Sequence, residues 1–156
     1  MINRLRQYIL DHVLTDVHLI GSSMGSLVGL NYAHRFGGIA HLLLPAPALT
    51  YLSGERVGLS LAEWEADRVG EIFHYGFNRL VRLRYDLEVD GRFYQTPPPP
   101  PAPITIIHGT EDKVVSVGAN RDYTQAYPDQ VQLIEVTAGH DINALWERLQ
   151  QVCLAR

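Results

Sequence analysis

The sequence is poor in cysteine, because Cys153 is the single one among 156 residues. One cysteine excludes an internal disulfide and a cysteine-based metal site, and its place in a helical apolar stripe predicts a buried thiol. Long apolar runs are also missing, so no segment approaches the length that spans a bilayer. Arg4, Arg6 and Asp11 interrupt the apolar core that a signal peptide would need. We therefore expect a soluble, cytoplasmic protein.

Positive charge is not in excess. The chain has 13 lysines and arginines against 17 acidic residues, which gives a net charge of −4. Without a basic surface, nucleic acid is not expected as a partner. The fractions of hydrophobic residues, 46%, and charged residues, 19%, are those of a globular domain. The length predicts a single domain over 1–156 with a substantial core.

The chain also lacks the histidine spacing of a metal site. None of its seven histidines falls in a pattern such as H-E-x-x-H, so we expect no metal centre. The histidines are predicted at scattered places: His12, His34 and His41 on helix or loop surfaces, His18 inside a strand, His74 in a hairpin and His108 at the end of a strand.

The first part of the chain alternates between helical and strand patterns. Apolar residues recur at helical spacing over 2–13, and a short β-branched run at 17–20 predicts a buried parallel strand. A helix is predicted over about 23–36, where Gly37-Gly38 end it, and a second buried strand over 39–44. Strand, tight turn, helix and strand form a βαβ unit whose connection should be right-handed.

The last third repeats this alternation. Strands are predicted at 104–107, ending in His108-Gly109, and at 131–136, with a helix over about 116–127 between them. A final helix follows, with its apolar face formed by residues between 142 and 152. The fold class predicted is therefore α/β: a parallel sheet of about four strands with helices on both faces.

The middle of the chain has a different pattern. A helix is predicted over 61–69 with Trp64 as its anchor, and strands over 71–75 and 80–85 form a β-hairpin excursion. Apolar and charged residues continue to alternate as far as Val89, which extends the strand prediction. The stretch 48–96 is a candidate cover for a site, and the prolines at 97–101 predict a stiff, extended spacer.

A turn motif joins the first strand to its helix. The residues Gly21-Ser22-Ser23-Met24-Gly25 fit G-x-S-x-G between a predicted strand and a predicted helix, which is the context that the motif requires. The tight turn needs small flanking residues and lifts the Ser23 hydroxyl clear of the sheet, at the positive end of a helix dipole. Ser23 is the candidate nucleophile, although a serine here can also simply cap the helix.

A serine nucleophile needs a base, and the base needs a residue that orients it. Asp112 follows the strand at 104–107 and His140 follows the strand at 131–136, so both should lie at the same sheet edge as Ser23. Taken singly, Asp112 could be a turn former and His140 a solvated helix end. The order Ser, Asp, His favours a triad, with Glu111 as the alternative acid.

Three segments resemble signatures of the α/β-hydrolase superfamily, in particular its short bacterial esterase-like members. They are the elbow at 21–25, IIHGTEDKVV at 106–115 and AGH at 138–140. The resemblance runs from about Val17 to the C-terminus. It implies hydrolysis of esters or thioesters through an acyl-enzyme, with no cofactor. It also implies that the backbone N–H of Met24 is one oxyanion donor and that a loop ahead of the elbow supplies the other.

The chain departs from this family at its start. Members place several strands before the elbow, whereas only 16 residues precede the first strand here. The expectation is a truncated or misassigned start, or a shortened relative. The strand Val17–Ile20 would then be a bare apolar edge that invites pairing, including homo-oligomerisation. Two other functions therefore stay open: a catalytically impaired remnant that acts as an interaction module, and an acyltransferase with the same triad.

Overall fold

The computed structural model describes residues 1–52, 54, 58–74, 77–141, 147 and 150. The chain divides into two compact units, one made of Met1–Leu49 with Thr96–Arg156 and the other of Thr50–Gln95. No helix in the described part of the chain is long and apolar enough to cross a membrane. The predicted final helix over 142–152 and Cys153 lie outside the described residues.

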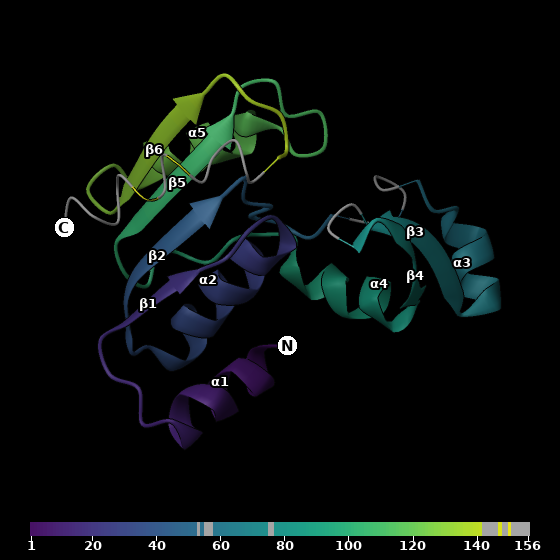
Figure 1. Cartoon of the computed structure of the whole chain (residues 1–156), viewed down its shortest axis with the longest axis horizontal. Coiled ribbons are helices and arrows are strands. Elements are labelled where there is room, and N and C mark those ends of the chain that lie inside the picture. Colours follow the sequence, from purple (N-terminus) through teal and green to yellow (C-terminus); the bar gives the residue numbers. More distant parts are fainter. Residues whose placement is uncertain (53, 55–57, 75–76, 142–146, 148–149, 151–156) are drawn as a thin grey trace. The chain divides into compact units, whose positions relative to one another are not determined.

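The first unit is built on a parallel sheet (Figure 1). Its four strands stand in the order β1-β2-β5-β6. This confirms the predicted sheet, and the strand bounds are β1 Val17–Ile20, β2 Ile39–Pro45, β5 Ile104–Gly109 and β6 Val131–Val136.

The two central strands are buried on both faces, which explains their continuous apolar runs. Successive side chains point to opposite faces, so Leu42 and Ile104 belong to one core cluster and Leu43 and Ile107 to another. The edge strand β1 differs, because its residues alternate between half-buried and exposed. The prediction of a buried strand at 17–20 was wrong in this respect, because among the described residues the strand has a neighbour on one side only.

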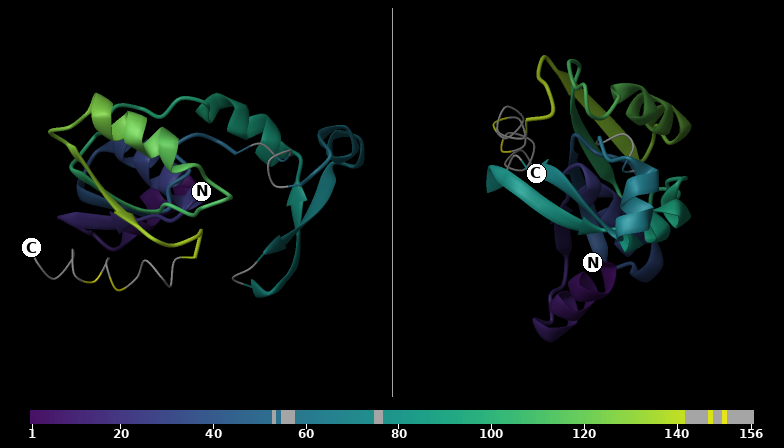
Figure 2. Two further views of the ribbon diagram at one scale, coloured as in Figure 1. Left: turned by 90° about the horizontal axis from the view of Figure 1, so that it is seen from above. Right: turned by 90° about the vertical axis from the view of Figure 1, so that its right-hand side faces the viewer.

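Three described helices pack on one face of this sheet (Figure 2, left). Helix α1 (Ile2–Asp11) contacts α2 (Met24–Phe36), and α5 (Val117–Ala126) links β5 to β6. The strand order advances in one direction, so right-handed crossovers place α2 and α5 on the same face. Gly37 ends α2 with φ 64°, as the sequence predicted.

The second unit contains the predicted hairpin, whose strands β3 (Val69–His74) and β4 (Arg79–Arg84) are antiparallel. Helix α3 (Leu61–Asp67) precedes it, and its Trp64 is buried and donates its indole N–H to the carbonyl of Leu83. The predicted hairpin thus lies inside the second unit.

The strand predicted to continue to Val89 was wrong. The chain turns instead into helix α4 (Asp86–Gly91), followed by the short 3₁₀ helix η3 (Arg92–Tyr94). Two acidic residues in the first turn of α4 favour a helix N-terminus. Glu88 is buried and accepts hydrogen bonds from the hydroxyl of Tyr51 and the N–H of Gly54. A helical turn brings Glu88 to these donors, so a tertiary contact outweighs the alternating pattern.

His41 was also wrongly predicted, as a surface residue. It lies in β2 with only 3% of its surface exposed. Its Nε2 is 3.0 Å from the hydroxyl oxygen of Thr105 on the neighbouring strand. Both faces of a central strand are buried, so the side chain of His41 is buried whichever face it occupies. A buried polar side chain needs a hydrogen-bond partner.

Candidate active site

The turn between β1 and α2 holds Ser23 in an unusual backbone conformation. Its φ is 49° and its ψ is −121°, a positive φ that residues with a side chain rarely adopt. Neighbouring backbone keeps it there: the N–H of Ser23 donates to the carbonyl of Pro45 at 3.2 Å, and its carbonyl accepts from the N–H of Ala48 at 3.1 Å. Such strain persists only where the surroundings impose it, and it is common at active sites.

The two glycines of the G-x-S-x-G motif differ in their roles. A Cβ on Gly21 would lie 2.6 Å from the carbonyl oxygen of Gly25, so only glycine fits at position 21. A Cβ on Gly25 would meet nothing within 4 Å. The hydroxyl of buried Ser26 donates to the carbonyl of Gly21 and ties the first turn of α2 to the end of β1. The prediction of small flanking residues thus has a steric basis at Gly21 alone.

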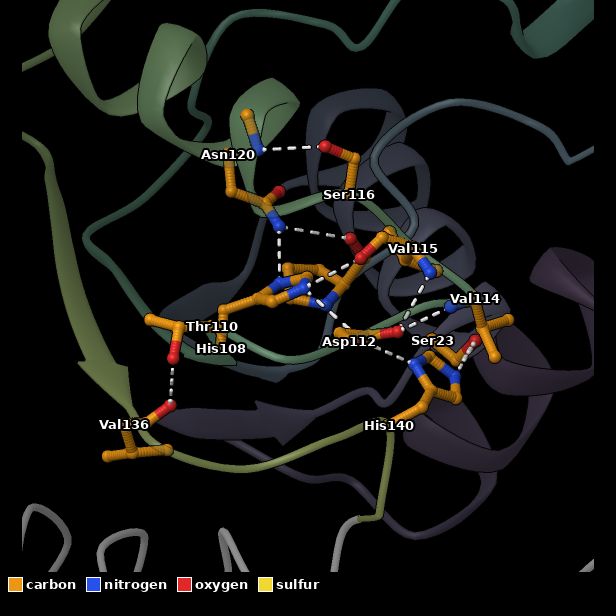
Figure 3. Close-up of polar contacts among 12 residues, drawn as sticks. Ser23, His108, Thr110, Asp112, Val114, Val115, Ser116, Asn120, Val136 and His140 are labelled. Carbon is orange, nitrogen blue, oxygen red and sulfur yellow. Dashed lines mark hydrogen bonds and ion pairs between the residues drawn. The ribbon is translucent and has the colours of Figure 1, made fainter.

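The structure brings together the three side chains that the sequence singled out (Figure 3). The Nε2 of His140 is 3.1 Å from the hydroxyl oxygen of Ser23. The Nδ1 of His140 is 2.6 Å from Oδ2 of Asp112. An ionised carboxylate only accepts hydrogen bonds, so Nδ1 carries the proton and Nε2 is left free to accept from Ser23.

Asp112 is held by the loop that follows β5. Its side chain is fully buried, and its Oδ1 accepts the backbone N–H groups of Val114 at 2.8 Å and Val115 at 2.9 Å. Burial by itself raises the pKa of the Asp112 carboxyl, but hydrogen bonds from Val115, His140 and Val114 outweigh it and hold the pKa below its ordinary value. The side chain is therefore an ionised acceptor at neutral pH. Glu111, the alternative acid, is exposed.

His108 is a residue of this site that the sequence did not single out. It was predicted only as a strand end, yet it is fully buried, with its Nε2 3.3 Å from Oδ2 of Asp112. The sequence feature that could have pointed to His108 is its position directly before Gly109 and four residues before Asp112. Gly109 is itself required, since a Cβ there would overlap the carbonyl of Ala138 in the loop that leads to His140.

The backbone N–H of the residue that follows Ser23 is a candidate donor for the site. Met24 is the first residue of α2, and the first N–H groups of a helix have no intrahelical partner. The next two N–H groups, of Gly25 and Ser26, donate to the carbonyls of Ser22 and Ser23. Met24 therefore carries the first N–H of α2, directly after Ser23 in the chain. Among the described residues, no group of histidine, cysteine and acidic side chains could hold a metal ion.

The arrangement of this chain is similar to that of solved structures, although no family model and no curated protein matches its sequence. The mouse alpha/beta hydrolase domain-containing protein 10 is 21% identical, with a TM-score of 0.69 over 96% of this chain and 67% of its own. An esterase from Exiguobacterium antarcticum is 17% identical, with a TM-score of 0.64 over 99% of this chain and 71% of its own. The chain has the α/β-hydrolase fold.

The chain spans only part of these neighbours. It covers 57% of the length of a similar structure from Agrobacterium vitis S4, at 21% identity and a TM-score of 0.66. In the α/β-hydrolase fold of this chain, Ser23, Asp112 and His140 follow the carboxyl ends of β1, β5 and β6. Ligands of open parallel sheets bind outside these strand ends, which is where the three side chains meet.

Replacing Gly21 tests the elbow geometry. We expect Gly21→Ala to lower the free energy of unfolding by about 1–3 kcal/mol, because the added methyl group meets backbone atoms that cannot rotate away. Chemical denaturation of the two proteins measures the difference. Gly25→Ala is the matched control and should be neutral or slightly stabilising, since its Cβ has open space in a helix. Equal effects of the two substitutions would contradict the steric argument.

The state of Asp112 gives a pH dependence of stability. Because its pKa is lower in the folded chain than its ordinary value of 3.8, the carboxylate stabilises the fold above that pH. This contribution is lost as the pH falls through the folded pKa. We therefore expect the difference in unfolding free energy between the wild type and Asp112→Asn to be largest near neutral pH and to shrink below about pH 4. A difference that does not vary between pH 7 and pH 3 would contradict this.

Proposed function

We propose that the chain carries the catalytic centre of a serine hydrolase that cleaves carboxylic esters or thioesters. The observation that carries the proposal is the continuous path from the Ser23 hydroxyl through the ring of His140 to buried Asp112. This is the order of contacts that activates a serine hydroxyl. A fold shared with an esterase supports the same chemistry.

The proposed reaction proceeds in two halves. The Ser23 oxygen attacks the acyl carbon while its proton passes to Nε2 of His140, and the electron pair of the carbonyl moves onto its oxygen. Collapse of this intermediate expels the alcohol or thiol, which takes the proton from His140, and leaves an acyl group on Ser23. Water then repeats the sequence and releases the acid. Throughout, Asp112 holds the ring and stabilises its cationic form.

The oxyanion would be held by the N–H of Met24. Its helix position supports this role, since the positive end of the α2 dipole adds to the hydrogen bond. Met24 would be one donor of the usual pair, and the loss of one such donor lowers turnover by roughly a hundred- to a thousandfold.

Labelling with a fluorophosphonate probe tests the activation of Ser23 directly, because it needs the nucleophile and base but not full turnover. We expect one adduct, mapped by mass spectrometry to Ser23 and absent in Ser23→Ala. His140→Ala should slow labelling on the order of a thousandfold or more, because the ring that accepts the Ser23 proton is removed.

The neighbouring serine offers a matched control. Ser22→Ala should label at the wild-type rate, since the contact with His140 belongs to Ser23. An adduct on another residue, or labelling of Ser23 that is unchanged in His140→Ala, would refute the proposed mechanism. Short-chain esters and thioesters assayed in parallel would identify the substrate class.

A second function is favoured by the edge of the sheet. Among the described residues β1 pairs only with β2, and Ile20 at its end is 50% exposed. The N–H of Gly21 donates to Leu43 in β2, so the alternation of a parallel strand turns the polar backbone of Ile20 outward. An unpaired apolar edge is a template for another strand. We propose that it pairs with the same edge of a second copy of this chain.

Sedimentation measures this association. We expect a dimer at micromolar concentration in the wild type and in Ser23→Ala, and a monomer in Ile20→Lys, because a charge on the edge opposes strand pairing. Val89→Lys is a control at another exposed apolar residue, outside the sheet of β1, and should leave the dimer intact. A monomeric wild type, or a dimer that survives Ile20→Lys, would refute strand pairing.

A further inference from the structure

Two buried polar side chains lie next to Asp112 but take no part in the contacts between Ser23, His140 and Asp112. His108 at the end of β5 and Asn120 in α5 are both fully buried. The amide nitrogen of Asn120 is 2.6 Å from Nδ1 of His108 and 3.3 Å from the carbonyl oxygen of Pro47. Buried polar groups need partners, and here one amide group serves two (Figure 3).

The partners fix where every proton lies. The carbonyl of Pro47 only accepts, so the NH₂ of Asn120 must face it, and its second hydrogen points to Nδ1 of His108. Nδ1 is therefore unprotonated and the proton of the neutral ring is on Nε2. That nitrogen is 3.0 Å from the carbonyl oxygen of Val115 and 3.3 Å from Oδ2 of Asp112, both of which accept.

The oxygen of the same amide has no hydrogen-bond partner among the described residues. A buried acceptor without a partner is unfavourable, so something must hold the amide in this orientation. The opposite orientation of the amide would set two acceptor oxygens, of Asn120 and Pro47, against each other. The orientation is thus imposed by its neighbours, and the tautomer of His108 follows from it.

The other end of this path is the nucleophile. Pro47 and Ala48 share one peptide group, whose carbonyl accepts from Asn120 and whose N–H donates to the carbonyl of Ser23. The path therefore runs from Ser23 through this peptide, Asn120 and His108 to Asp112. His140 closes it through its contacts with Asp112 and Ser23. Hydrogen bonds in such a chain polarise and strengthen one another in a buried environment.

We propose that His108 and Asn120 are positioning residues. Through this closed path they fix the loop that carries Asp112 relative to the turn that carries Ser23. The proposal rests on the function proposed above. The Nε2–H of His108 points toward both Val115 and Asp112 and so holds the loop that carries the acid. Asn120 links His108 to the peptide group between Pro47 and Ala48. Neither residue touches a substrate. Their effect is exerted on the distance between Ser23, His140 and Asp112, where a displacement of about 1 Å lowers the rate about a hundredfold.

Two substitutions of His108 separate its hydrogen bond from its volume. His108→Gln keeps a side-chain N–H near the position of Nε2, whereas His108→Leu fills the space without a donor. We expect His108→Leu to slow fluorophosphonate labelling of Ser23 by about 10- to 100-fold and His108→Gln to restore it to within about threefold. Equal labelling rates in both variants and the wild type would overturn the proposal.

His41 supplies the matched control, because it too is a buried histidine of this sheet with a side-chain partner. His41→Leu should destabilise the fold to a similar extent as His108→Leu, yet leave the labelling rate of the folded protein unchanged. A similar loss of labelling in both would show a general effect of destabilisation and would overturn a specific role of His108.

Nuclear magnetic resonance tests the proposal without any reaction. In ¹⁵N-histidine-labelled protein we expect His108, assigned by its absence in His108→Gln, as the Nε2–H tautomer. The short contact of His140 with Asp112 should give a low-field Nδ1 proton that is shifted or lost in His108→Leu. A protonated Nδ1 on His108 would overturn the proposal. If the probe fails to label even the wild type while these signals are present, the proposed function fails and the positioning network stands.

Asn120→Leu provides a second route if His108→Leu does not fold. It removes the donor to Nδ1 and leaves His108 in place. We expect labelling to slow as in His108→Leu, while the Nε2–H tautomer persists because Val115 and Asp112 still accept from it. An unchanged labelling rate in folded Asn120→Leu would overturn the role of the amide.

Discussion

The positive φ of Ser23 is the constraint on which the rest of this site depends. A side chain in that conformation raises the energy of the turn, and the chain adopts it because Pro45 and Ala48 bind the backbone of Ser23 on both sides. Those two contacts require β2 to run past the elbow, and Gly21 must be glycine for the helix to start so close to the strand. The strain aims the hydroxyl at His140 instead of at the end of its own helix.

The acid is governed by a balance between burial and hydrogen bonding. Removal of Asp112 from water would favour its neutral form, and the two N–H groups of its own loop together with His140 reverse that preference. The same loop places its carbonyl at Val115 within reach of His108. A short loop therefore performs two tasks: it keeps the carboxylate ionised and joins it to the buried histidine behind it.

Much of this arrangement could be predicted from local patterns. The four strands and the helices α1, α2 and α5 follow from apolar runs, helical spacing and glycine stops, because each is specified by residues close together in the chain. The sequence singled out Ser23, Asp112 and His140 because each follows a predicted strand of the same direction, and the structure places the three side chains in contact. The predictions failed where a distant partner decided the outcome. Glu88 is buried against Tyr51 and Gly54 in a helix over 86–91, and the hydroxyl of Thr105 lies next to the buried ring of His41.

The sequence by itself determined which residues could meet. The carboxyl ends of parallel strands lie at one edge of the sheet, and Ser23, Asp112 and His140 each follow such a strand. The tertiary structure alone decided the distances, the burial of Asp112 and the part played by His108 and Asn120. No local pattern marks those two residues, which lie 12 positions apart on a strand and a helix. Their roles depend on their partners Pro47, Val115 and Asp112. Those contacts exist only once the chain has packed, so local sequence patterns do not reveal them.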